Sequence, residues 1–62
     1  MIIVNPEPTF DRLEDALRRA RKDEALSEEP RYVLVYESGG YQVIRRKPLG
    51  GTWFTSDGTQ HG

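Results

Sequence analysis

The stretch from residue 31 to residue 47 constrains the fold most, because it predicts a β-hairpin with two faces that both need cover. Its first arm, residues 32–36, reads YVLVY and is apolar at every position; its second arm, residues 41–44, reads YQVI. β-Branched and aromatic residues suit strands, and a glycine-containing connection between two such runs is typical of a hairpin. Successive side chains of a strand point to opposite faces, so one helix can cover only one face of this hairpin.

Two registers are open, since either of two dipeptides can form a two-residue turn. We favour closure at Ser38-Gly39, which makes a tyrosine-rich face with the pairs Tyr36–Tyr41, Leu34–Val43 and Tyr32–Arg45 and leaves Val33, Val35 and Ile44 on the reverse side. Closure at Gly39-Gly40 slips the register and pairs Tyr36 with Val43 and Val35 with Ile44.

The segment before the hairpin predicts an amphipathic helix. Its apolar residues recur at helical spacing and form one stripe, made of Phe10, Leu13, Ala16, Leu17 and Ala20. Thr9 is the candidate N-cap, and Glu24 would fall on the stripe, so the helix is expected to end near Asp23. In the connection that follows, Leu26 is expected to anchor the loop on the core. The helix should pack through Phe10, Leu13 and Leu17 onto Val33, Val35, Ile44 and Phe54.

Short strands are predicted before the helix, at residues 2–4, and after the hairpin, at residues 52–55. In the second of these, Phe54 is placed under the helix and Trp53 on the tyrosine face. The resulting fold class is α+β, with one amphipathic helix packed on a small, mainly antiparallel sheet of three to four strands in the order β-α-β-β-β. We expect one domain over residues 1–56 and a flexible C-terminal tail over residues 57–62.

Length and charge restrict the function. In a chain of 62 residues, burial of apolar surface barely offsets chain entropy, so self-association is an expected reinforcement. The net charge of −1 makes no general electrostatic case for nucleic acid. Neither a signal peptide nor an apolar stretch long enough for a membrane span is recognisable, so we expect a cytoplasmic protein that does not bind membranes.

Catalytic and metal chemistry are poorly supported. Ser56, Asp57 and His61 are the residue types of a nucleophilic triad, but they lie in a glycine-rich terminus without a rigid supporting shell. The chain has one histidine and no cysteine, which argues against a metal site. We therefore expect no enzyme, no catalytic residue and no cofactor.

The sequence favours a small non-enzymatic protein-binding domain, an adaptor, inhibitor or regulatory subunit, that meets an unidentified protein partner or a second copy of itself through the open face of the sheet. Aromatic residues are enriched at interfaces, and the expected partner-binding residues are Tyr32, Leu34, Tyr36, Tyr41, Val43, Arg45 and Trp53. Cations beside a glycine loop can hold an anion, and the candidate residues are Arg45, Arg46, Lys47, Gly50 and Gly51. The alternative is a nucleic-acid-binding protein that uses the aromatic and basic side chains of the same hairpin.

Overall fold

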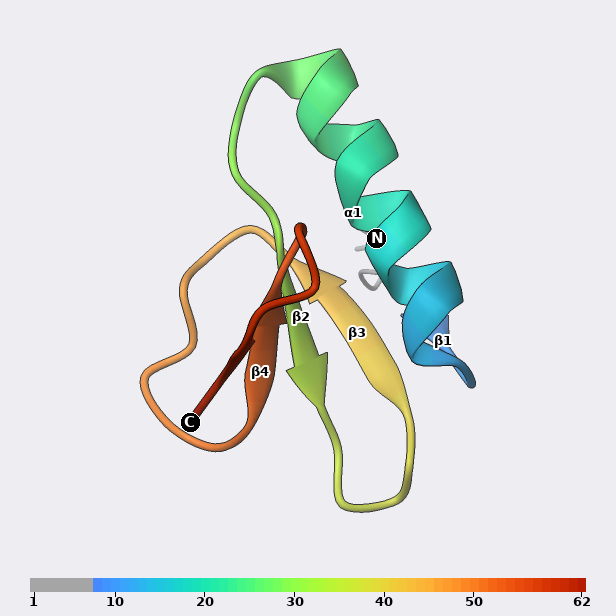
Figure 1. The fold of residues 1–62 in the computed structure, drawn as a ribbon, viewed down its shortest axis with the longest axis vertical. Helices are drawn as coiled ribbons and strands as arrows, with labels where there is room; N and C mark the ends of the chain where they lie inside the picture. Colours follow the sequence, from blue (N-terminus) through green and yellow to red (C-terminus); the bar gives the residue numbers. More distant parts are fainter. Residues whose placement is uncertain (1–7) are drawn as a thin grey trace, which may run out of the picture.

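The computed structural model of the chain describes residues 8–62, in which one helix packs on a five-stranded antiparallel sheet (Figure 1). The elements are β1 (Thr9–Phe10), α1 (Leu13–Ser27), β2 (Tyr32–Val35), β3 (Tyr41–Ile44), β4 (Trp53–Thr55) and β5 (Gln60–His61). The strands lie side by side in the order β1-β3-β2-β4-β5. The predicted α+β class is confirmed, with slightly more strands than expected. The strand predicted at residues 2–4 lies outside the described residues.

A three-residue turn connects β2 to β3, so neither predicted two-residue closure is correct. The Tyr36 N–H donates to the Gly40 carbonyl at 2.9 Å, and the Gly39 N–H donates to the Tyr36 carbonyl at 3.0 Å. Gly39 has φ 94°, a left-handed conformation that suits glycine and is typical of three-residue hairpin turns. The turn thus comprises residues 37–39, with glycine in its last position.

This turn sets a register that differs from both predictions. The observed pairs are Tyr32–Ile44, Val33–Val43, Leu34–Gln42 and Val35–Tyr41. Compared with the favoured register, the strands are displaced by one residue, which moves side chains of one strand to the other face of the sheet. Tyr41 and Val43 consequently share a face with Val33, and Ile44 shares the opposite face with Tyr32.

The hydrophobic core lies between α1 and the sheet, and its centre is built from small side chains. Ala16, Ala20 and Val33 have no exposed surface, and Val43 is 3% exposed. Phe10, Leu13, Leu17, Tyr41 and Phe54 are partly buried and pack against this cluster. The predicted packing of the helix stripe on Val33 and Phe54 is therefore confirmed. The prediction for Ile44 is wrong, because the observed register places it on the far face, and Val35 is not part of the cluster.

The beginning of α1 is not capped by Thr9 as predicted. Thr9 pairs with Gln42 in β1, and the β3 residue Val43 donates its N–H to the Pro8 carbonyl at 3.1 Å. Arg12 occupies the N-cap position with extended backbone (φ −123°) and makes no side-chain capping hydrogen bond. Pairing with the sheet thus takes up the residues that were expected to begin the helix.

The helix also ends later than predicted, at Ser27 and not near Asp23. The Glu24 carboxylate, which lies on the inner side of the helix, accepts the Arg31 backbone N–H at 3.0 Å. A polar group at that position is therefore satisfied and does not end the helix. Termination comes at Glu28, a left-handed residue (φ 59°) whose N–H donates to the Glu24 carbonyl at 2.8 Å.

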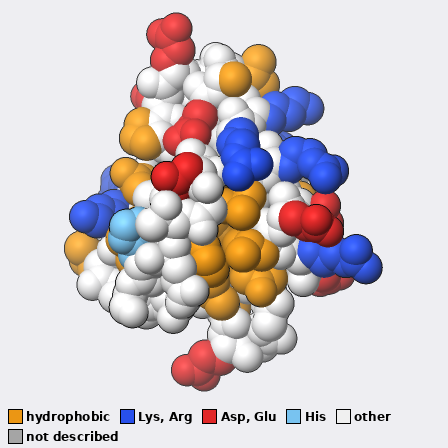
Figure 2. Space-filling model, viewed as in Figure 1, with side chains coloured by type: hydrophobic (Ala, Val, Ile, Leu, Met, Phe, Trp, Pro, Cys, Tyr) orange, Lys and Arg blue, Asp and Glu red, His pale blue; other side chains and the backbone are white. Residues whose placement is uncertain are grey.

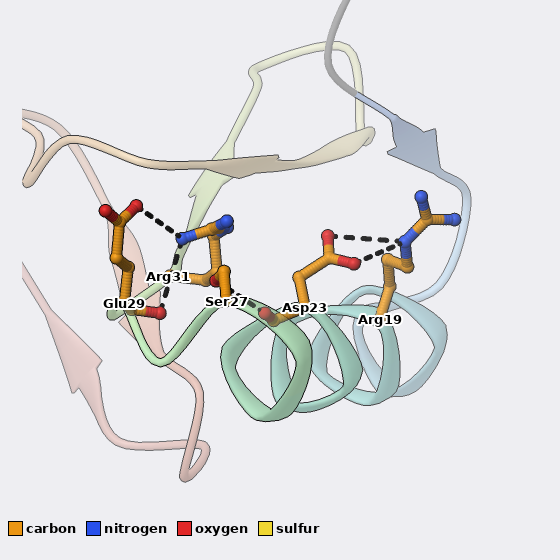
Figure 3. A network of polar contacts seen from close by, with 5 residues as sticks. All are labelled: Arg19, Asp23, Ser27, Glu29 and Arg31. Carbon is orange, nitrogen blue, oxygen red and sulfur yellow. Dashed lines mark hydrogen bonds and ion pairs between the residues drawn. The ribbon is translucent and has the colours of Figure 1, made fainter.

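Arg31, and not Leu26, holds the connection after α1 in place (Figure 3). Leu26 is 76% exposed, so its predicted anchoring role is wrong. Arg31 is 7% exposed, and its Nη1 donates to the carbonyls of Glu29 at 3.3 Å and Pro30 at 3.2 Å. The last turn of α1 has no basic residue, so Arg31 supplies a positive charge near the negative end of the helix dipole.

The C-terminal residues, predicted as a flexible tail, contain β5. His61 pairs with Trp53 of β4, and the connecting turn repeats the geometry of the first, with the Gly58 N–H donating to the Thr55 carbonyl at 2.9 Å and Gly58 at φ 93°. The Arg21 Nε donates to the Ser56 carbonyl at 2.8 Å, which ties this turn to α1. Within residues 8–62, no helix is long and apolar enough to cross a membrane.

Candidate functional site

The sheet face opposite α1 is the best candidate for a functional surface, and we call it the open face. Register and alternation place nine side chains on it: Thr9, Tyr32, Leu34, Tyr36, Gln42, Ile44, Trp53, Thr55 and His61. The helix packs on β1, β2 and β3 from the other side, and no second layer of strands or helices covers the open face in the described part of the chain. Four predicted partner-binding residues, Tyr32, Leu34, Tyr36 and Trp53, are thereby brought together.

Trp53 forms the centre of the open face, but its ring is largely enclosed. It is 7% exposed, with the Tyr32 ring edge-on at 5.6 Å and the His61 ring stacked at 4.3 Å with an interplanar angle of 13°. The Lys47 Nζ lies 5.7 Å from the Trp53 ring centroid, a cation–π arrangement. Trp53 is thus a fixed support for its neighbours and offers little free ring surface.

Tyr36 marks the accessible end of the open face. Its side chain is 41% exposed and its hydroxyl donates to the Gln42 Oε1. Beside it lies a shallow hollow of about 460 Å³, lined by Val35, Tyr36, Glu37, Gly51 and Thr52. The lining combines apolar and aromatic surface with one carboxylate, that of Glu37.

Three of the predicted partner-binding residues do not belong to the open face. Tyr41 and Val43 lie on the helix side, where Val43 is part of the core and Tyr41 packs against it. Arg45 does not pair with Tyr32, because Ile44 occupies that position; it is exposed beyond the end of β3. All three differences follow from the register of the β2–β3 hairpin.

The basic residues between β3 and β4 are exposed and have no acidic partner in the described part of the chain. Within residues 8–62, no carboxylate lies at ion-pair distance from Arg45, Arg46 or Lys47. The same holds for Arg21 and Lys22 on α1, whereas Arg12, Arg18, Arg19 and Arg31 have such partners. Figure 2 shows basic side chains at the flank opposite α1, over this connection. The glycines of the predicted anion site follow, and a side chain at Gly62 would collide with the Gly51 carbonyl.

A second apolar surface, which sequence reasoning missed, lies on the helix side. Figure 2 shows hydrophobic side chains gathered at the centre of the view between α1 and the C-terminal hairpin. Leu17, Tyr41 and Phe54 pack on the core there but remain partly exposed. Since α1 lies over β1, β3 and β2, it leaves part of β4 uncovered. A single 15-residue helix is too small to cover all five strands, so the sizes of the elements indicate an uncovered region on this side.

Asp57 and His61 make contacts with different neighbours. The Asp57 carboxylate accepts hydrogen bonds from the Thr55 hydroxyl and from the Thr59 N–H (2.9 Å). These bonds lower its pKa from 3.8 to about 2, so the group is an ionised acceptor that supports the turn. His61 stacks on Trp53 instead. In the described residues, no group of three metal-ligating side chains could hold a metal ion.

No family model, curated protein or solved structure matches this chain.

Proposed function

We propose that this chain is a small non-enzymatic protein-binding domain that engages its partner through the open face. One observation carries the proposal: the exposed Tyr36 and the half-buried Tyr32, Leu34 and Ile44 share a sheet face that no helix or strand within residues 8–62 covers. Aromatic side chains with a polar tip are enriched at such interfaces. A cytoplasmic adaptor, inhibitor or regulatory subunit is the role this surface suits, and two copies of the chain can also meet through it.

The nucleic-acid alternative is less well supported by the geometry. Sequence-tolerant binding of single strands relies on aromatic rings with free faces on which bases stack. The Trp53 ring is covered by His61, and the exposed ring of Tyr36 lies next to Glu37, whose charge repels phosphate. The basic residues 45–47 can attract a phosphate backbone, but without stacking partners they provide charge alone.

The proposal is tested with a double variant of the open face, Leu34→Thr with Tyr36→Thr. Threonine keeps strand propensity and removes apolar contact area. We expect the double variant to fold and to bind the partner roughly thirtyfold more weakly than the wild type, since interface anchors often contribute more than ~2 kcal/mol. Partner proteins captured on the wild-type chain are identified by mass spectrometry, purified and titrated against each variant, with folding checked by circular dichroism.

Leu26→Thr is the matched control, because Leu26 is a 76% exposed apolar residue on the outer end of α1. It should bind as the wild type does. A double variant that folds and binds with unchanged affinity would remove the open face from the proposal.

A further inference from the structure

The charges around the open face are unevenly distributed. At the end near Tyr32 and Ile44, the chain continues into Arg45, Arg46 and Lys47, which have no acidic partner in the described residues. At the other end, Tyr36 is followed by the exposed carboxylate of Glu37. The same end also holds the Asp57 carboxylate, which accepts from the Thr55 hydroxyl, and Thr55 pairs with Tyr32. With three cations against this one carboxylate the end is positive, whereas the end at Glu37 is negative, and apolar side chains lie between.

From this arrangement we propose that the partner segment is an acidic peptide with an apolar anchor, an inference that rests on the proposed function. Its carboxylates pair with the guanidinium groups of Arg45 and Arg46 and with Lys47, and its apolar side chain lies over Leu34 toward the hollow beside Tyr36. Arginine favours this contact because its planar group can hold a carboxylate through two hydrogen bonds. Glu37 disfavours the reverse orientation by repelling acidic residues from the far end.

The length of the surface sets the size of the segment. Tyr32 and Tyr36 are four residues apart along one strand, a span of about 13 Å at ~3.3 Å per residue. An extended peptide covers that distance with about four residues. The inference therefore describes a short linear segment, with its acids toward the β3–β4 connection and its apolar residue toward the β2–β3 turn.

The fluorescence of Trp53 can report when the acidic residues of the peptide are bound. It is the chain's one tryptophan, and Lys47 lies over its ring. A carboxylate that draws the ammonium group away from the ring changes the surroundings of the indole. Binding of an acidic segment should therefore shift the tryptophan emission, whereas binding confined to the helix side should leave it unchanged.

The experiment is a selection of phage-displayed random short peptides on the immobilised wild-type chain. We expect enrichment of sequences in which Asp or Glu residues stand next to Leu, Ile or Phe. Synthetic peptides from the selection are then titrated against two triple variants with equal loss of charge. One is Arg45→Gln, Arg46→Gln, Lys47→Gln; the control on α1 and its N-cap is Arg12→Gln, Arg18→Gln, Lys22→Gln. Circular dichroism verifies that both fold.

Affinity should fall about tenfold in the first variant, because three exposed ion pairs are lost, and should stay within about twofold in the control. Selected peptides without acidic bias that bind both variants equally would overturn this inference but leave the protein-binding proposal intact. A selection that enriches nothing would overturn the acidic-peptide inference alone, because the protein-binding proposal is tested separately with captured partner proteins. Equal loss in the two variants would show a non-specific charge effect and overturn the acidic-peptide inference alone.

Discussion

The apolar side chains on the two faces of the sheet are covered in different ways. On the helix side, Ala16 and Ala20 bring α1 so close to Val33 that none of the three has exposed surface. On the open face, cover comes from side chains alone: Trp53 is enclosed by Tyr32, His61 and Lys47. A neighbouring helix thus produces a core, whereas cover by side chains alone leaves a sheet face on which no further helix or strand packs within residues 8–62.

Truncation of an apolar side chain on the helix side should destabilise the protein most. Leu17→Ala removes a side chain that packs on the core and should cost about 2–3 kcal/mol of unfolding free energy, a large part of the stability of so small a domain. Leu26→Ala is the control on the same helix, because Leu26 is 76% exposed, and it should change stability by less than about 0.5 kcal/mol. Urea denaturation followed by circular dichroism measures both. Equal losses in the two variants would contradict the assignment of the core.

The second comparison makes the same substitution on opposite faces. Tyr41→Thr removes a ring that packs against the core and should cost about 2 kcal/mol, somewhat less than truncation of a fully buried aromatic residue. Tyr36→Thr removes a ring that is 41% exposed and should cost about 1 kcal/mol or less. Thermal denaturation gives both values. If Tyr36→Thr were as destabilising as Tyr41→Thr, the open face would be part of the core.

The smallest effect concerns pH and lies outside both faces. The pKa of Asp57 is lowered from 3.8 to about 2, so the stability contributed by its ionised form is present above pH 3.8 and is lost as the pH falls toward 2. In Asp57→Asn the charge is absent at every pH. The difference in Tm between wild type and variant should therefore shrink between pH 4 and pH 2, as scanning calorimetry would show. A constant difference would mean that the hydrogen bonds to Thr55 and Thr59 do not depend on ionisation.

Much of the fold could be predicted from the spacing of apolar residues, which recur every two residues in a strand and every 3.6 residues in a helix. The helix stripe, the positions of the hairpin strands and the placement of Phe54 and Trp53 on opposite faces all follow from these periods, and the structure confirms them. These features depend on side-chain type alone. They are robust because burial of apolar area dominates the choice of face.

The register could not be predicted in the same way, because it depends on one turn. Gly39 in a left-handed conformation closes a three-residue loop, although the glycines of the sequence also suit two-residue loops at 38–39 and 39–40. A displacement by a single residue exchanges the faces, which is why Tyr41 and Val43 were assigned to the candidate interface. The same turn recurs at residues 56–58, so the local sequence does contain a recognisable signal.

The ends of the helix were missed for a different reason, since each is decided by a contact with a distant strand. Pairing of Thr9 with Gln42 overrides its propensity to cap, and the hydrogen bond from Arg31 to Glu24 allows α1 to continue to Ser27. Neither partner can be identified from helical spacing. Local propensity is outweighed wherever a backbone group finds its partner far along the chain.

The close approach of α1 to the sheet has an evolutionary consequence. Any larger side chain at Ala16 or Ala20 would push the helix off Val33, and any side chain at Gly39 or Gly58 would meet an unfavourable backbone conformation. Divergent relatives of this protein should therefore keep small residues at these four positions while the exposed residues of the open face change with their partners. That spacing of small residues is the signature by which remote members of its lineage can be recognised.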